Sequence, residues 1–113
     1  MDKEVLENVK YKDLDQLLYD EDVIRFLRKK LDNFTLNVFR EVLNHNKEHR
    51  GLVKTRMENF HNMRKRYDAA FLTLEVQGFI EKREDGTATP YYVTVRGLQL
   101  LEILKQDKKE SIK

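Results

Sequence analysis

Basic side chains gather in one segment of the chain. Positions 50 to 66 hold six lysines and arginines against a single acid, Glu58. The six basic residues are Arg50, Lys54, Arg56, Arg64, Lys65 and Arg66. Ammonium and guanidinium groups donate hydrogen bonds to phosphate oxygens, and arginine also pairs with the edge of guanine. The cluster therefore predicts either a surface that binds a polyanion or, as for many charge runs, an ordinary solvated helix face.

Residue types that support catalysis or metal binding are scarce. The chain has no cysteine, and its one serine, Ser111, lies in the charged C-terminal tail, so His61 has no nucleophile to activate. His45 and His49 are spaced to share one helical face, but no cysteine or carboxylate set completes a metal site. No glycine-rich loop that would cradle a phosphate is present. We expect no enzyme, no cofactor and no metal.

Charge and composition bound the class of protein. Residues 1–24 carry eight acids against three bases, a net charge of −5, and because the whole chain is at +2 the remainder carries +7. A chain of 113 residues with 40% hydrophobic residues supplies one core. No apolar run is long enough to cross a bilayer, and the charged first residues do not begin a signal segment. We expect a cytoplasmic protein with one main domain.

The first two thirds of the chain have helical periodicity. Val23 to Leu31 and Leu36 to Leu43 each repeat apolar residues at spacings of three and four. Asp20 or Asp22 is the expected cap of the first of these helices, and Asn33 or Thr35 that of the second. Two shorter apolar stripes precede them, one at Val5 to Val9 and one behind a capping Asp13 that includes Leu14, Leu17 and Leu18. Residues 1–32 are therefore predicted to form a helical N-terminal extension.

Two interpretations remain open for residues 55–77. Thr55 and Glu58 have the spacing of a capping box, which predicts a helix start. An apolar stripe from Tyr67 to Leu74 then leads to Gly78, a residue typical of helix ends. If Asn62 caps a second helix, this region is two helices joined by a turn. If nothing breaks it, it is one long helix, and the fold is a helical bundle with a hairpin.

After Gly78 the pattern changes to strands. Residues 79–83 and 90–96 alternate like the two strands of a hairpin, with a turn at 84–89. Thr94 is the expected cap of a final helix that carries Leu98, Leu101 and Leu104. The chain becomes strongly charged from Lys105 onward, and residues 107–113 are predicted to be a disordered tail.

The last third of the chain resembles a known fold family. It contains LTLEVQGFIEKR at 72–83, DG at 85–86 and YVTVRGLQLL at 92–101. These segments are similar to the winged-helix (winged helix-turn-helix) regulators of the MarR and PadR groups. In those groups a leucine-bearing helix is followed by glycine, two hydrophobic residues, a charged wing and a leucine-threonine-x-x-glycine helix start. The resemblance covers residues 33–106 and implies an α+β, mostly helical winged helix-turn-helix domain with a β-hairpin wing.

The resemblance also implies a function. It indicates sequence-specific binding of double-stranded DNA by a transcriptional regulator, with a recognition helix in the major groove and the wing on the backbone. The DNA-binding residues are then Lys54, Arg56, His61, Asn62, Arg64, Lys65, Arg66, Asp68, Lys82, Arg83 and Thr87. The apolar surplus of residues 1–32 predicts a homodimer that reads two half-sites. The alternative is a winged-helix interaction module whose basic face binds an acidic protein partner.

Overall fold

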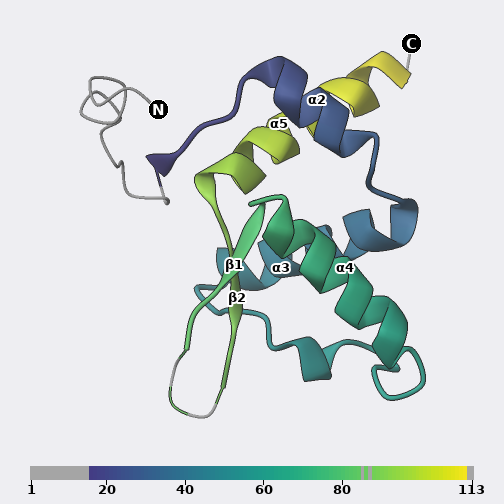
Figure 1. Ribbon diagram of the computed structural model, residues 1–113, viewed down its shortest axis with the longest axis vertical. Helices are drawn as coiled ribbons and strands as arrows, with labels where there is room; N and C mark the ends of the chain where they lie inside the picture. Colours follow the sequence, from purple (N-terminus) through teal and green to yellow (C-terminus); the bar gives the residue numbers. More distant parts are fainter. Residues whose placement is uncertain (1–15, 85, 87, 112–113) are drawn as a thin grey trace, which may run out of the picture.

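Helices dominate the fold, and a short β-hairpin projects from them (Figure 1). The computed structural model describes residues 16–84, 86 and 88–111. In chain order the elements are α2 (Glu21–Arg28), α3 (Asn33–Lys47), the 3-10 helix η2 (Lys54–Arg56), α4 (Arg64–Val76), β1 (Ile80–Lys82), β2 (Tyr91–Val93) and α5 (Val95–Ser111). The predicted α+β, mostly helical class is confirmed. No helix in the described ranges is long and apolar enough to span a membrane.

The core lies between α3, α4 and the hairpin. The predicted apolar stripe of α3 is buried: Leu36, Phe39 and Val42 are each at most 2% exposed. They pack with the inner face of α4 and with Phe79, whose ring centroid lies 6.5 Å from that of Phe39 in an edge-to-face arrangement. The helical spacing of apolar residues therefore identified the buried faces correctly.

The N-cap of α3 lies one residue before Asn33 and three before Thr35, the two predicted caps. This N-cap is Asp32, whose backbone is extended and whose carboxylate accepts a hydrogen bond of 2.8 Å from the backbone N–H of Thr35. The predicted caps Asn33 and Thr35 are wrong, because Asn33 is already helical and Thr35 is the donor. This bond from the Thr35 backbone N–H, with help from its side chain, lowers the pKa of Asp32 below 3.8.

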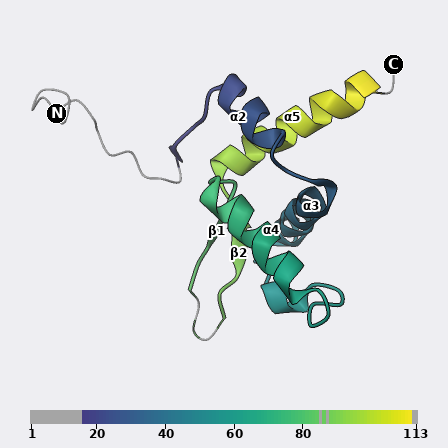
Figure 2. The same cartoon turned by 45° about the vertical axis from the view of Figure 1, so that its right-hand side comes forward.

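Helix α2 follows its sequence prediction in part. Asp20 has the extended backbone of an N-cap, but its side chain makes no capping hydrogen bond. Glu21 and Asp22 occupy the first turn, and Arg25 and Arg28 the last, so both ends complement the helix dipole. The helix packs along α5 (Figures 1 and 2).

Residues 55–77 are not one helix. After η2 the chain makes a series of turns, with Asn59 at a φ of +58°, and α4 begins only at Arg64. The capping box at Thr55 is wrong, because the helix there ends after three residues. Asn62 does not cap α4 either: its amide donates to the Asn59 side chain at 2.8 Å. Phe60 explains the break, because it folds back and stacks on Tyr67 with ring centroids 6.0 Å apart.

The predicted hairpin forms, but its strands have only three residues each, and residues 95 and 96, predicted as strand, begin α5. Gly78 ends α4 with a φ of +84°, a conformation that favours glycine. The antiparallel register pairs Ile80 with Val93 and Lys82 with Tyr91. Leu52 adds a third strand position, because its backbone exchanges two hydrogen bonds with Tyr91, of 3.1 and 2.9 Å. The three segments therefore make one small antiparallel ladder.

Helix α5 is longer than predicted. Thr94 caps it as expected, because its hydroxyl accepts from the Gly97 backbone N–H at 3.1 Å. The helix then continues to Ser111, so residues 107–111 are helical where we expected a disordered tail; residues 112 and 113 lie outside the described residues. Arg25 of α2 explains the difference, since it donates to Gln106 at 3.1 Å and to Asp107 at 3.4 Å.

The predicted N-terminal extension is described only from residue 16. Residues 17–20 form no helix, and Leu17 and Leu18 are exposed, so the helix expected there is wrong. The stripe at Val5 to Val9 and the capping Asp13 lie outside the described residues. Tyr19 instead ties this segment to the domain: its backbone N–H and C=O bond to the Gln99 side chain at 3.0 and 2.9 Å.

Candidate nucleic-acid interface

Helix α4 separates an apolar inner face from a charged N-terminal turn. Tyr67, Ala70, Phe71 and Leu74 are buried, as the sequence predicted. Because a helix turns by about 100° per residue, this leaves the preceding basic residues on three different sides of the first turn. Arg64, Lys65 and Arg66 are all exposed there. Their exposure agrees with the prediction, but the three side chains point in different directions.

The first turn of α4 has neither a side-chain cap nor an acid. The N-cap residue, Met63, makes no side-chain capping bond. Three cations there face the positive end of the helix dipole, which costs roughly 0.3–1 kcal/mol for each charge at low salt. Residues 61–66 also line a shallow hollow of about 500 Å³ at this end. An anion bound at this turn would remove the unfavourable charge.

Asp68 organises the flank of α4 that faces η2. Its carboxylate lies 2.7 Å from the Lys54 ammonium and 3.8 Å from the Arg64 guanidinium. Lys54 keeps about a third of its side chain exposed (32%), and Arg64 about three quarters (73%). Asp68 therefore holds two cations at one place and partly neutralises them.

Arg66 points toward α3 rather than with Arg64. Its guanidinium carbon lies 4.3 Å from the centre of the Phe34 ring, a cation–π arrangement. Lys65 lies between these two flanks, on the outer side of the helix. The triplet predicted as one basic cluster is therefore spread around the first turn, with one charge on each side.

His61 and Asn62 lie in the turn before α4, beside these cations. Both are exposed. The His61 ring packs edge-to-face on Phe60 with centroids 5.8 Å apart, and Asn62 bonds to Asn59. Neither contributes to the helix end itself, so their role is to shape the turn.

The hairpin carries the second set of predicted residues. Lys82 and Arg83 are exposed, and the Arg83 guanidinium pairs with Glu81 at 2.6 Å while its carbon lies 4.9 Å from the centre of the Tyr92 ring. Thr87 lies outside the described residues. The hairpin and the N-terminal end of α4 project from the same side of the molecule in both views (Figures 1 and 2).

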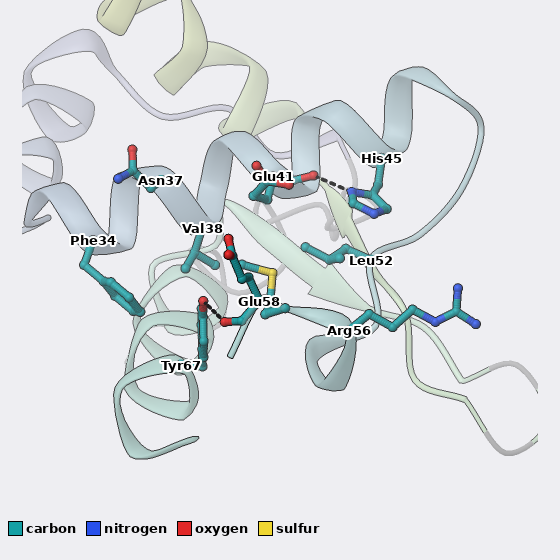
Figure 3. A pocket seen from close by; sticks show the side chains of 10 residues that line it. Phe34, Asn37, Val38, Glu41, His45, Leu52, Arg56, Glu58 and Tyr67 are labelled. Atoms are coloured by element: carbon teal, nitrogen blue, oxygen red, sulfur yellow. Dashed lines mark hydrogen bonds between the residues drawn. The ribbon is translucent and has the colours of Figure 1, made fainter. Parts of the chain in front are cut away.

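Arg56 is the last residue of η2 and precedes both of these elements in the chain. It is exposed, and Figure 3 shows its guanidinium extending away from the body of the domain, toward the hairpin. Of the predicted site, the structure brings Lys54, Arg64 and Asp68 into contact. Lys82 and Arg83 lie on the hairpin, whose strand β1 packs against α4.

The sequence analysis missed one feature of α4. Its outer face continues from Lys65 through Ala69 to Leu72 and Val76, and the last two are 59% and 75% exposed. The helical spacing of three and four residues carried this signal, but the sequence analysis used Leu72 and Val76 only as part of the segment that resembles a known fold family. An apolar stripe thus adjoins the basic turn.

Comparisons with protein-family models, curated proteins and solved structures found no match for this chain. In the part of the chain that the structure describes, no group of three or more His, Asp or Glu side chains is placed to hold a metal ion. His45 and His49 do not act together there: the His45 ring contacts the Glu41 carbonyl, and His49 has a φ of +61° beyond the end of α3. The candidate site rests on the geometry of α4 and the hairpin.

Proposed function

We propose that this chain is a winged-helix domain that binds double-stranded DNA in a sequence-specific way and regulates transcription. Helix α4 is the recognition helix, and the β1–β2 hairpin is the wing. The order of elements supports the proposal: a helix (α3), a strand position at Leu52, a short helical turn (η2), α4, the hairpin and α5. The helix that would precede the recognition helix is then reduced to the three residues of η2.

One observation carries the proposal: exposed cations lie on two elements that project from the same side of the molecule. Lys65 and Ala69 face outward from α4, where a lysine donates to guanine and a small apolar side chain contacts a thymine methyl group. Arg64 and Lys54, held by Asp68, flank that face and contact phosphates. Lys82 and Arg83 reach the backbone from the hairpin.

The first experiment measures binding to random-sequence duplex DNA across a series of salt concentrations. We expect a Kd of about 1–100 μM near physiological salt that weakens steeply as salt rises. Replacing Arg64, Lys65 and Arg66 together by alanine removes between one and three phosphate contacts on such DNA, which lowers the slope of log K against log salt by roughly 1 to 3. This variant is the direct test of the α4 face.

The matched control replaces Lys29, Lys47 and Lys105, three exposed cations on other helices, by alanine. It changes the net charge by the same amount and is expected to keep most of the affinity. Equal losses in both triple variants would mean that only net charge matters. No binding at low salt would reject the proposal. Confirmed binding leads to selection of a specific duplex.

The proposal includes a homodimer, because duplex readers of this kind bind two half-sites. Val23 and Phe26 on α2 support it, since they are 41% and 59% exposed on the layer that α2 forms with α5. Light scattering at increasing concentration tests it, beside a Phe26→Glu variant. A monomeric mass at all concentrations would remove this part of the proposal and leave DNA binding by a single copy.

A second candidate is an interaction module that binds an acidic protein. The stripe of Leu72 and Val76 favours it, because exposed apolar side chains beside a basic turn are typical of protein interfaces. The pairing of Asp68 with Lys54 and Arg64 also leaves fewer cations for phosphate. Leu72→Ser with Val76→Ser separates the two without adding charge to this face: it abolishes binding to such a partner, whereas DNA binding through Lys65 and the hairpin falls only modestly.

A further inference from the structure

A hollow of about 400 Å³ lies between α3, the segment from η2 to Glu58, and α4 (Figure 3). It exists because η2 has only three residues. A longer helix at this place would pack across the face of α3 that carries Val38 and Glu41 and would cover it. Its volume is within the range of sites for small molecules, about 300–1,000 Å³.

The walls of the hollow divide into an apolar part and an acidic part. Val38, Leu52 and Met57 line the apolar part, and the rings of Phe34 and Tyr67, with centroids 5.1 Å apart, form an aromatic wall. Glu41 from α3 and Glu58 from the segment after η2 also line it, and neither carboxylate forms an ion pair with a described residue.

The one arginine of the lining does not neutralise these carboxylates. Figure 3 shows the Arg56 guanidinium directed away from Glu41 and Glu58, toward the hairpin. His45 is engaged with the carbonyl of Glu41 at 3.0 Å. Arg66 already contacts the Phe34 ring, so the attraction for a cation comes from the two carboxylates, which lie beside an apolar floor.

We propose that this hollow binds an amphipathic organic cation of the arylalkylamine class. The ammonium group lies at the carboxylates of Glu41 and Glu58, and the ring lies on the apolar floor against Phe34 and Tyr67. The inference does not depend on DNA binding, because the predicted DNA-contacting face of α4 is formed by other residues. A link to α4 exists nonetheless: the Tyr67 hydroxyl donates to the backbone carbonyl of Glu58 at 2.7 Å.

The test is a titration of the full chain with phenethylamine, followed by amide chemical shifts. We expect saturable shifts at the amides of residues 37–41, 57–58 and 67, with a Kd of about 1 mM, as suits so small a ligand. The neutral isostere 2-phenylethanol, which has a hydroxyl in place of the ammonium, is expected to bind at least about fivefold more weakly. Phenylacetate is expected to cause no saturable shifts.

Glu41→Gln and Glu58→Gln keep the size of each side chain and remove its charge. Both residues are exposed, so neither change endangers folding, and unchanged amide shifts elsewhere confirm this. Each variant is expected to weaken phenethylamine binding about fivefold, whereas Glu102→Gln on the exposed face of α5 leaves it unchanged. Absence of shifts, equal binding of the alcohol, or full affinity in both Gln variants would overturn the proposal.

Discussion

A glycine can be required because there is no space for a side chain or because its backbone conformation is left-handed. Gly97 and Gly86 each illustrate one of these two reasons. A Cβ on Gly97 would lie 2.3 Å from the Phe79 carbonyl oxygen and 2.6 Å from Cγ1 of Val93. A Cβ on Gly86 would meet no atom within 4 Å, but its φ is +64°. One position therefore needs glycine for close packing of α5 on the hairpin, and the other only for its backbone.

We predict that Gly97→Ala lowers the free energy of unfolding by about 2–3 kcal/mol, because backbone must move to admit the methyl group. Gly86→Ala should lower it by about 1 kcal/mol through left-handed strain alone. Urea denaturation measures both. Equal effects of the two substitutions would show that α5 and the hairpin are not in contact at Gly97.

The contribution of Asp32 to the stability of the fold depends on pH. Its pKa is lowered in the folded state by the hydrogen bond from the Thr35 backbone N–H, so its stabilising effect is complete above the unfolded value of 3.8. The effect is lost as the pH falls below that value through the folded pKa. We predict that Asp32→Ala melts a few degrees below the wild type at pH 7.

Asp32→Asn is the matched control, because it keeps an oxygen acceptor at the N-cap without the charge. It should melt close to the wild type at pH 7 and should lose less stability than the wild type below pH 4. Thermal melts at a series of pH values measure this. A constant difference between Asp and Asn at every pH would contradict a stabilising role for the charge.

At the scale of elements, one side chain joins α3 to the hairpin. The Asn46 carbonyl oxygen accepts from the Val93 backbone N–H at 2.8 Å, and its amide nitrogen donates to the carbonyl of Arg50 at 2.8 Å. A buried donor or acceptor left without a partner costs about 1–3 kcal/mol. Asn46 therefore fixes the end of α3 against β2.

We predict that Asn46→Ala lowers the free energy of unfolding by about 1–3 kcal/mol and accelerates hydrogen exchange at the Val93 amide. Asn44→Ala, at an exposed position of the same helix, should have little effect. A destabilised Asn46→Ala protein in which the Val93 amide stays fully protected would show that another group accepts this hydrogen bond.

The sequence predicted those elements that local chemistry decides. Helical spacing located the buried faces of α3 and α4, Gly78 marked the end of α4, and Thr94 capped α5. The predictions were wrong where contacts between residues far apart in the sequence determine the local structure. The break before α4 depends on Phe60 stacking on Tyr67.

The same limit applies to the end of α5 and to the candidate site. The last turns of α5 are supported by Arg25, 82 residues away from Asp107 in the chain. The basic cluster was visible in the sequence, but the directions of Arg64 and Arg66 are set by Asp68 and Phe34. Residue types predicted which charges are present, and tertiary contacts determine where they point.

At the scale of the whole molecule, the segment before α2 is tied to both α4 and α5. Besides the two bonds between Tyr19 and the Gln99 side chain, the Tyr19 hydroxyl donates to the Gln77 carbonyl at 2.7 Å. Arg96 adds a bond of 2.9 Å to the carbonyl of Leu17. The N-terminal segment is thus an integral part of the domain as far as the structure describes it.

We predict that Gln99→Ala releases this segment, because it removes two hydrogen bonds at once. Hydrogen exchange at the Tyr19 amide should become much faster, and the free energy of unfolding should fall by about 1–2 kcal/mol. Glu102→Ala, one turn further along α5, is the control and should change neither. Unchanged protection at Tyr19 would mean that Arg96 and the tyrosine hydroxyl suffice to hold the segment.

The two ends of α4 are held very differently. At its C-terminal end, the Gly78 carbonyl accepts from Thr94 at 2.6 Å and from Arg96 at 2.8 Å, and Tyr19 bonds to the neighbouring carbonyl of Gln77. The N-terminal end has no side-chain cap. That end is held instead by side chains further along the helix, through the pair of Asp68 with Lys54 and the hydrogen bond from Tyr67 to Glu58. Because the 13 residues of α4 span roughly 20 Å, a rotation of about 5° about Gly78 would move the basic end by about 2 Å against these contacts.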